Sequence, residues 1–217
     1  MVSKKTDNQK IIQKGAEAIL YLNEEKQLVK ERIPKSYRIK VLDEKIRKLR
    51  TRNESKIIAL LENKICVPKI IRTNEQTKKI IMEFIEGKKL SEYLDKFKIK
   101  DQKKICRQVG KNTGEIHQLH IIHGDLTTSN MILKPESNNK KIYFIDFGLA
   151  YRSHKWEDRA VDLHLLRRAL EAKHFKNWRE NFHEVLKGYK ESYKDKKDVE
   201  TVMKRLEKVE KRGRYKH

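Results

Sequence analysis

The chain has 217 residues, which is enough for one or two compact units with a buried core. Hydrophobic residues make up 37% of the sequence and charged residues 39%, and 53 Lys and Arg against 31 Asp and Glu give a formal net charge of +22. This charge is far from that of an ordinary small soluble enzyme, and it favours a polyanionic partner, a nucleic acid rather than a membrane.

The first part of the chain predicts a small antiparallel sheet and one long helix. Apolar runs at residues 11–21 and 28–32 flank a polar turn and predict strands, and residues 78–85 predict another. Between them, residues 40–64 follow a helical period of 3.6 residues. The apolar positions of this helix are Leu42, Ile46, Leu49, Ile57, Leu60 and Leu61.

The rest of the chain predicts mostly helices. Ser91 is expected to cap a short helix, and Asp101 a long helix that ends at His120. A hairpin at residues 131–133 and 142–145 follows. Three further helices are expected at residues 156–172, 178–193 and 199–209.

The segment at residues 121–130, IIHGDLTTSN, carries the strongest chemical signal. Asp125 and Asn130 lie within it, and an Asp-Phe-Gly triplet begins at Asp146. In protein kinases the first Asp orients and deprotonates the acceptor, while the Asn and the second Asp hold Mg²⁺ against the phosphates of ATP. Each residue alone is common in turns. Their order predicts phosphoryl transfer from ATP, with Asp125 as catalytic base and Asn130 and Asp146 as ligands of Mg²⁺.

The predicted strands supply candidates for binding the phosphates. Gly15, Ala16, Glu17 and Ala18 stand where a kinase has its phosphate loop, with one of the usual three glycines retained. Lys30 stands where a kinase strand has the lysine that holds the α- and β-phosphates. We therefore expect the four loop residues to bind ATP and Lys30 to be catalytic.

The long helix and the strand after it supply the remaining candidates. A kinase helix in this position carries a Glu that pairs with the lysine. Glu54 is preferred over Glu62 because apolar residues lie one to two turns beyond it, and a solvated surface carboxylate is the alternative. Glu83 and Ile85, in the hinge-like segment 82–87, are expected to present backbone groups to the adenine edge.

Together these parts predict an α+β, two-lobed protein-kinase-like fold with a small β-rich N-lobe and a helical C-lobe. The N-lobe is expected at residues 1–86 and the C-lobe at residues 87–210, followed by a flexible basic tail at residues 211–217. Asp162 falls where kinases have a buried Asp that braces the catalytic loop.

The activation segment is predicted to be short. Kinases that phosphorylate proteins usually have an Arg directly before the catalytic Asp, which reads a phosphate on the activation loop, and here the residue is Gly124. Asp162 follows Asp146 by only 16 positions, and no Ala-Pro-Glu follows. A peptide substrate would therefore have little surface on which to lie. Small-molecule phosphotransferases also use His-Gly-Asp, so they remain an alternative.

These motifs resemble one family closely: the small atypical kinase subunit of the KEOPS (EKC) complex, related to the RIO kinases. The resemblance covers nearly the whole chain, and the run PKSYR and the double Thr after Asp125 are specific to this family. The matching segments are residues 15–18, 29–32, 34–38, 50–54, 123–130, 146–150 and 157–163, and the Arg-Gly-Arg at residues 212–214.

The resemblance implies a role in making threonylcarbamoyladenosine in tRNAs that read codons beginning with A. It implies an ATPase that serves a threonylcarbamoyltransferase subunit, bound through the C-lobe, and a small third subunit bound through the N-lobe. The expected contacts with tRNA in the tail are Lys211, Arg212, Arg214 and Lys216. Some archaeal relatives are fused to the transferase, and no such domain precedes the kinase here, so the chain is either stand-alone or an excised part of a fusion.

Other features bear on location and on rival functions. No segment approaches the roughly 18 apolar residues that span a bilayer, the N-terminus lacks a signal peptide, and Cys66 and Cys106 are expected to be buried free thiols. These features predict a cytoplasmic protein. One rival is a tRNA-binding scaffold with little turnover, because residues 30–52 carry ten Lys and Arg against three acids. A lysine-rich composition adapted to heat would instead explain the charge alone.

Overall fold

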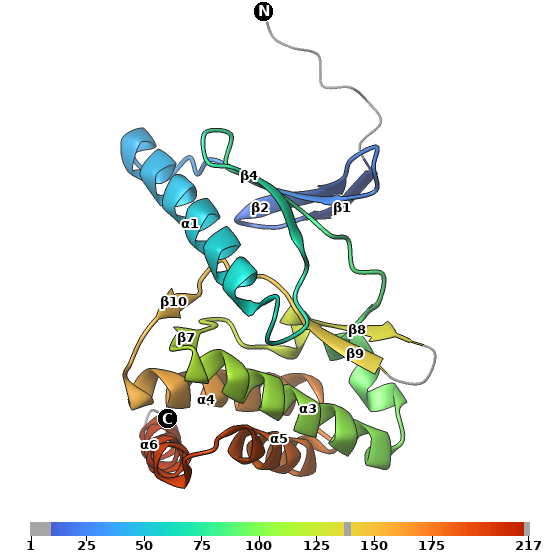
Figure 1. The fold of residues 1–217 in the computed structure, drawn as a ribbon, viewed down its shortest axis with the longest axis vertical. Coiled ribbons are helices and arrows are strands. Elements are labelled where there is room, and N and C mark those ends of the chain that lie inside the picture. Colours follow the sequence, from blue (N-terminus) through green and yellow to red (C-terminus); the bar gives the residue numbers. More distant parts are fainter. Residues whose placement is uncertain (1–9, 137–139, 215–217) are drawn as a thin grey trace, which may run out of the picture.

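The computed structural model describes residues 10–136 and 140–214. Figure 1 shows a sheet with one long helix stacked on a part built mainly of helices. The five strands of the upper sheet are antiparallel in the order β1-β2-β3-β5-β4. Their bounds are β1 (Lys10–Lys14), β2 (Ala18–Leu22), β3 (Leu28–Arg32), β4 (Ile70–Asn74) and β5 (Lys79–Met82).

The strand predictions need two corrections in the upper sheet. The run at residues 11–21 is two strands, because Gly15 donates to the Ala18 carbonyl at 2.9 Å and so turns the chain between β1 and β2. Strand β4 was not predicted from the sequence. It lies at the edge of the sheet and is only partly buried, so it has no clear alternation of apolar residues.

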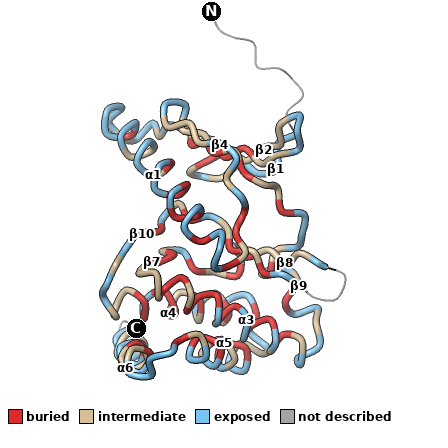
Figure 2. Tube along the Cα trace, viewed as in Figure 1, coloured by how far each residue is buried: buried red, intermediate tan, exposed pale blue. Residues whose placement is uncertain are grey.

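Helix α1 (Lys40–Leu61) crosses the sheet beside β4 and β5. It ends three residues before the predicted end at residue 64. Three apolar positions of the predicted period are about half exposed: Leu42 at 50%, Leu49 at 50% and Leu60 at 47%. Most of the N-terminal half of α1 is exposed (Figure 2), whereas Ile57 and Leu61 reach the core. The helical period of the apolar residues therefore predicted the helix, but it did not predict how much of the helix packs against the rest of the protein.

The lower part contains two small sheets and most of the helices. Strands β6 (Lys88–Lys89), β8 (Met131–Pro135) and β9 (Lys140–Phe144) form one sheet, and β7 (Ile121–Ile122) pairs with β10 (Tyr151–Arg152). The helices are α2 (Leu90–Tyr93), η1 (Leu94–Lys96), α3 (Ile99–Gln118), η2 (Thr128–Asn130), α4 (Trp156–Lys173), α5 (Trp178–Ser192) and α6 (Lys196–Arg214).

The predicted caps of α2 and α3 were wrong. The N-cap positions are Lys89 and Lys98, so Ser91 and Asp101 lie inside the first turns. The charge of Asp101 still favours the N-terminal end of α3, where the helix dipole is positive. At the other end of the chain, α6 continues to Arg214, so much of the predicted flexible tail is helical.

Close contact between α3 and α5 organises the helical core. A Cβ atom at Gly110 would lie 1.9 Å from the Val185 carbonyl oxygen, and one at Gly188 would lie 1.9 Å from that of Arg107. The missing side chains therefore let the two backbones touch. No helix within the described residues is long and apolar enough to cross a membrane.

Candidate active site

A cleft of about 520 Å³ lies where the upper sheet faces residues 121–130, the predicted catalytic segment. Four predicted site features line it: the turn at residues 15–18, Lys30 of β3, Asp125 and Asp146. Arg50 of α1, which was not predicted as a site residue, lines it too. These residues come from distant parts of the sequence. The fold therefore gathers most of the predicted phosphate-binding and catalytic residues around one space.

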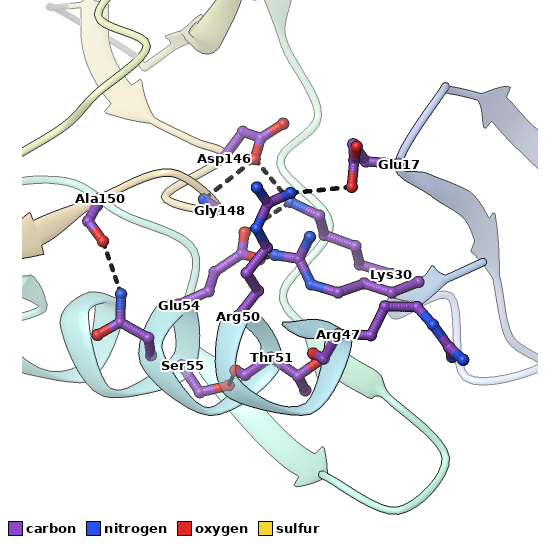
Figure 3. Close-up of polar contacts among 12 residues, drawn as sticks. Glu17, Lys30, Arg47, Arg50, Thr51, Glu54, Ser55, Asp146, Gly148 and Ala150 are labelled. Carbon is purple, nitrogen blue, oxygen red and sulfur yellow. Dashed lines mark hydrogen bonds and ion pairs between the residues drawn. The ribbon is translucent and has the colours of Figure 1, made fainter. Parts of the chain in front are cut away.

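Lys30 is held by two carboxylates. Its Nζ lies 2.6 Å from Glu54 Oε1 and 2.7 Å from Asp146 Oδ1 (Figure 3). Burial would lower the pKa of Lys30, but the negative charges of Glu54 and Asp146 outweigh burial and raise the pKa above its ordinary value. Lys30 therefore stays charged although it is buried, and Glu54 fixes its position as predicted for a kinase.

Arg32 is a second cation on the same carboxylate, and it was missed from the sequence. Alternate residues of a strand share a face, so Arg32 follows Lys30 into the site, and its Nη2 lies 2.5 Å from Glu54 Oε2. A Cβ atom at Gly148 would lie 2.9 Å from the same Nη2, so the glycine of the Asp-Phe-Gly triplet makes room for the guanidinium. The alternation of two cations on β3 was the signal in the sequence.

Asp146 adopts an unusual backbone conformation at the edge of the cleft. Its φ is +62°, a left-handed value that is uncommon for a residue with a side chain. Burial tends to raise the pKa of Asp146, but Lys30 and the Gly148 N–H, which donates to Oδ1 at 3.3 Å, lower it. The side chain is still 51% exposed, so its oxygens can reach a ligand in the cleft. Such strain is often found at functional sites.

Asp125 and Asn130 are tied to each other in the catalytic segment. Asn130 Nδ2 donates to both the backbone oxygen and Oδ2 of Asp125, each at 2.9 Å. The Asn130 carbonyl oxygen accepts from the Ile145 N–H at 3.0 Å, next to Asp146. Asp125 and Asn130 are thus linked directly, and Asp146 is held next to them through its neighbour Ile145. Carboxylate and amide oxygens such as these suit Mg²⁺.

Asp162 holds the backbone of the catalytic segment from α4. It accepts from the N–H groups of His123 at 2.8 Å and Gly124 at 3.0 Å, and its Oδ2 lies 3.1 Å from His117 Nε2. Burial tends to raise the pKa of Asp162, but these hydrogen bonds lower it below the ordinary value. This is the bracing role that the sequence predicted.

Replacing Asp162 with Asn is expected to lower the free energy of unfolding by about 2 kcal/mol, because an amide cannot accept from all three donors and leaves buried groups unpaired. Because the pKa of Asp162 is lowered by folding, its contribution is complete above pH 3.8 and is lost as pH falls through the lowered pKa. Urea unfolding of both proteins from pH 7 to pH 3 measures this. A difference that is absent at pH 7 would contradict the bracing role.

The backbone at Gly124 explains why no Arg precedes Asp125. Its φ is +78°, and a Cβ atom there would lie 2.5 Å from the Leu149 carbonyl oxygen. A residue with a side chain would be strained and would also collide with this backbone. The backbone conformation at position 124 therefore excludes the Arg that would bind a phosphate on the activation loop.

Other predicted site residues lie away from the cleft. Among the described residues, its walls do not include Glu83 or Ile85. The Glu83 N–H donates to the Lys69 carbonyl at 2.9 Å, and Ile85 is buried. Lys211 and Arg212 are exposed on α6, far from the sheet (Figure 1), and Arg212 Nη1 lies 2.6 Å from Glu157 Oε1. Lys216 and the side chain of Arg214 lie outside the described residues.

The sequence is 44% identical to the KEOPS complex subunit Bud32 of Pyrococcus abyssi, in an alignment of 216 positions that covers 95% of this chain and 96% of that protein. The chain belongs to the Bud32 family. The model of the lipopolysaccharide kinase (Kdo/WaaP) family also matches, over residues 22–189. The resemblance stated from the motifs is thereby confirmed.

Two further similarities concern length and fold. A probable bifunctional tRNA threonylcarbamoyladenosine biosynthesis protein of Methanobrevibacter smithii is 39% identical over 95% of this chain, which spans only 37% of that protein. The crystal structure of a Rio2 kinase–ADP/Mg²⁺–phosphoaspartate complex from Chaetomium thermophilum matches with a TM-score of 0.64 at 13% identity, over 91% of this chain and 70% of that one. This structural match confirms the predicted kinase-like fold.

Proposed function

We propose that the chain binds MgATP in the cleft and acts mainly as an ATPase that serves the making of threonylcarbamoyladenosine in tRNA. The observation that supports this most is the cluster of Lys30, Glu54 and Asp146, in which Lys30 and Asp146 line the same cleft as Asp125. This is the arrangement of charges that phosphoryl transfer requires. The family relation to KEOPS subunits supports the tRNA pathway.

Each residue has a defined part in the proposed reaction. Lys30, fixed by Glu54, binds phosphate oxygens, and Asp125 orients and deprotonates the acceptor, a water molecule or a Ser or Thr hydroxyl. Asp146 and Asn130 supply oxygen ligands for Mg²⁺, which neutralises charge on the phosphates when bound. The Glu83 N–H already donates to Lys69, so the proposed contact with the adenine edge is left to the Glu83 carbonyl oxygen and the backbone of Ile85. The rate then comes from positioning and charge stabilisation rather than from a covalent intermediate.

The short segment after Asp146 favours hydrolysis over the phosphorylation of peptides. Tyr151 and Arg152 already pair with Ile122 and Ile121, and α4 begins at Trp156. Little chain is left to form a platform for a substrate peptide. Water is therefore the acceptor that fits this segment best.

The surface supports the proposed partners. Tyr37, Ile39 and Val41 are 74%, 75% and 79% exposed at the start of α1 and just before it, which suits a small protein partner on the N-lobe. We propose that a threonylcarbamoyltransferase binds the C-lobe, where Phe175 is exposed. The net charge of +22 suits tRNA, with Lys211, Arg212, Arg214 and Lys216 as contacts. We propose a cytoplasmic site of action.

A tRNA-binding scaffold with little turnover is the second candidate function, favoured by the exposed basic residues Lys211 and Arg212 on α6. Replacing both with Ala would then weaken tRNA binding and reduce its salt dependence. Unchanged binding at several salt concentrations would contradict this function.

Incubation with γ-labelled MgATP, with and without the transferase, tests the ATPase. Free labelled phosphate that increases with the partner is the expected result, whereas label on protein would indicate a protein kinase. Asp125→Asn is expected to lower the release of phosphate by about 10²–10⁴-fold, the usual contribution of a general base. Asp101→Asn, far from the cleft, serves as the matched control, and equal rates in the two variants would contradict the assignment.

A further inference from the structure

Arg50 is a cation of the cleft to which the kinase motifs give no role. It lies one turn before Glu54 on α1, and residues four apart share a face of a helix. Arg50 therefore faces the cleft that Lys30 and Arg32 also line. Its Nη1 lies 3.0 Å from Oε2 of Glu17, in the turn between β1 and β2 (Figure 3).

The charges of the cluster around Lys30 cancel one another. Lys30 and Arg32 contribute two positive charges, and Glu54 and Asp146, which bind them, contribute two negative charges. This inner cluster has no surplus of positive charge for a triphosphate. A further cation at the cleft would supply it, and Arg50 is the nearest along α1.

The partner of Arg50 is replaceable. Among the described residues, Glu17 is the one carboxylate within ion-pair distance of Arg50, and its side chain is 42% exposed. Glu17 also has another cation, since Arg38 Nη2 lies 3.4 Å from its Oε1. Glu17 can therefore release Arg50 and keep a charged partner outside the cleft.

Glu17 and a bound triphosphate would compete for the same guanidinium. Both are anionic and both would lie on the wall formed by residues 15–18, so they repel each other. A guanidinium forms two parallel hydrogen bonds with phosphate as readily as with a carboxylate. A more highly charged anion in the cleft would therefore take the place of Glu17.

We propose that Arg50 binds the phosphates of the nucleotide, and that Glu17 holds this guanidinium until a nucleoside triphosphate displaces the carboxylate. This inference rests on the proposed function, because it requires ATP in the cleft. The proposal assigns a role to Glu17, the acidic residue of the turn at residues 15–18. Glu17 holds the Arg50 guanidinium beside the cleft, and because it competes with the phosphates it lowers the affinity for nucleotide.

Two substitutions break the same ion pair but have opposite expected effects. Arg50→Ala removes a charge-assisted hydrogen bond to phosphate and is expected to weaken MgATP binding about tenfold. Glu17→Gln removes the competing carboxylate and is expected to tighten MgATP binding about threefold. Titration calorimetry of the full chain measures both, and AMP, with fewer phosphate charges, should show a smaller change for each variant.

Arg47→Ala is the matched control. Arg47 lies one turn earlier on α1, pairs with Asp43 at 2.7 Å and does not line the cleft, so its loss should leave MgATP binding unchanged. If Glu17 and Arg50 only brace the loop, Glu17→Gln and Arg50→Ala will both weaken binding, and the inference is overturned. An equal loss of AMP and MgATP affinity in Arg50→Ala would overturn it too.

The variant Arg50→Lys distinguishes an effect of the lost positive charge from an effect of disturbed packing. It retains a positive charge, and it is expected to bind MgATP with an affinity between those of the parent chain and Arg50→Ala. An affinity as low as that of Arg50→Ala would mean that packing rather than charge matters, against the inference. If the parent chain itself does not bind MgATP, the proposed function fails, and this inference fails with it.

Discussion

Replacing Asp146 with Asn is expected to lower Mg²⁺-dependent turnover of ATP by about a thousandfold. The amide keeps the shape of the side chain but removes the charge that binds the metal and stabilises charge developing on the phosphates. Because Asp146 is half exposed and Glu54 continues to hold Lys30, the fold should persist. Release of phosphate at saturating MgATP, together with a thermal melt, measures both effects.

Asp158→Asn is the matched control for Asp146. Asp158 lies at the start of α4, where it accepts from Ser153 Oγ at 2.6 Å, and it does not line the cleft. Its replacement should leave turnover close to that of the parent chain. Full activity in Asp146→Asn would remove Asp146 from the catalytic machinery.

Replacing Glu54 with Gln should lower the free energy of unfolding by about 3–5 kcal/mol, the usual cost of leaving a buried charge without its partner. Glu54 is 1% exposed and binds Lys30 with one oxygen and Arg32 with the other, so one substitution disturbs two buried cations. Turnover should fall as well, because Lys30 is no longer fixed. Urea denaturation measures the stability.

Glu75→Gln provides the comparison for Glu54. Glu75 pairs with Arg52 at 2.6 Å on the surface, where solvent weakens the ion pair. Its replacement should change stability little. A second replacement, Arg32→Met in the Glu54→Gln protein, should restore part of the lost stability, because it removes the cation left without a carboxylate, whereas Lys30 still has Asp146. Equal losses in Glu54→Gln and Glu75→Gln would show that the buried cluster contributes nothing special.

The sequence predicted the kinase-like fold because chemistry restricts the order of its motifs. The Asp-Phe-Gly triplet and the His-Gly-Asp segment have few rival meanings when they occur together. Lys30 and Glu54 could then be found by position, and the structure brings them within 2.6 Å. Arg32 was missed because the kinase pattern assigns no residue two positions after the lysine, although the alternation of a strand places it there.

Details that depend on tertiary packing could not be predicted. Leu42 and Leu49 follow the helical period, but the sheet is too small to cover the first half of α1. Ser91 and Asp101 are good capping residues in isolation, yet the helices begin two and three residues earlier than these residues would place them. Strand pairing and helix docking decide these boundaries, and neither can be read from local propensity.

The left-handed backbone at Gly124 also restricts how this chain can evolve. Converting the residue to Arg would require a different φ and a shift of the Leu149 backbone, so a single substitution cannot introduce the residue that reads an activation-loop phosphate. Two coordinated changes separate this chain from such a phosphorylation switch. Control of its activity is therefore more readily acquired through partners that bind it than through covalent modification of the chain.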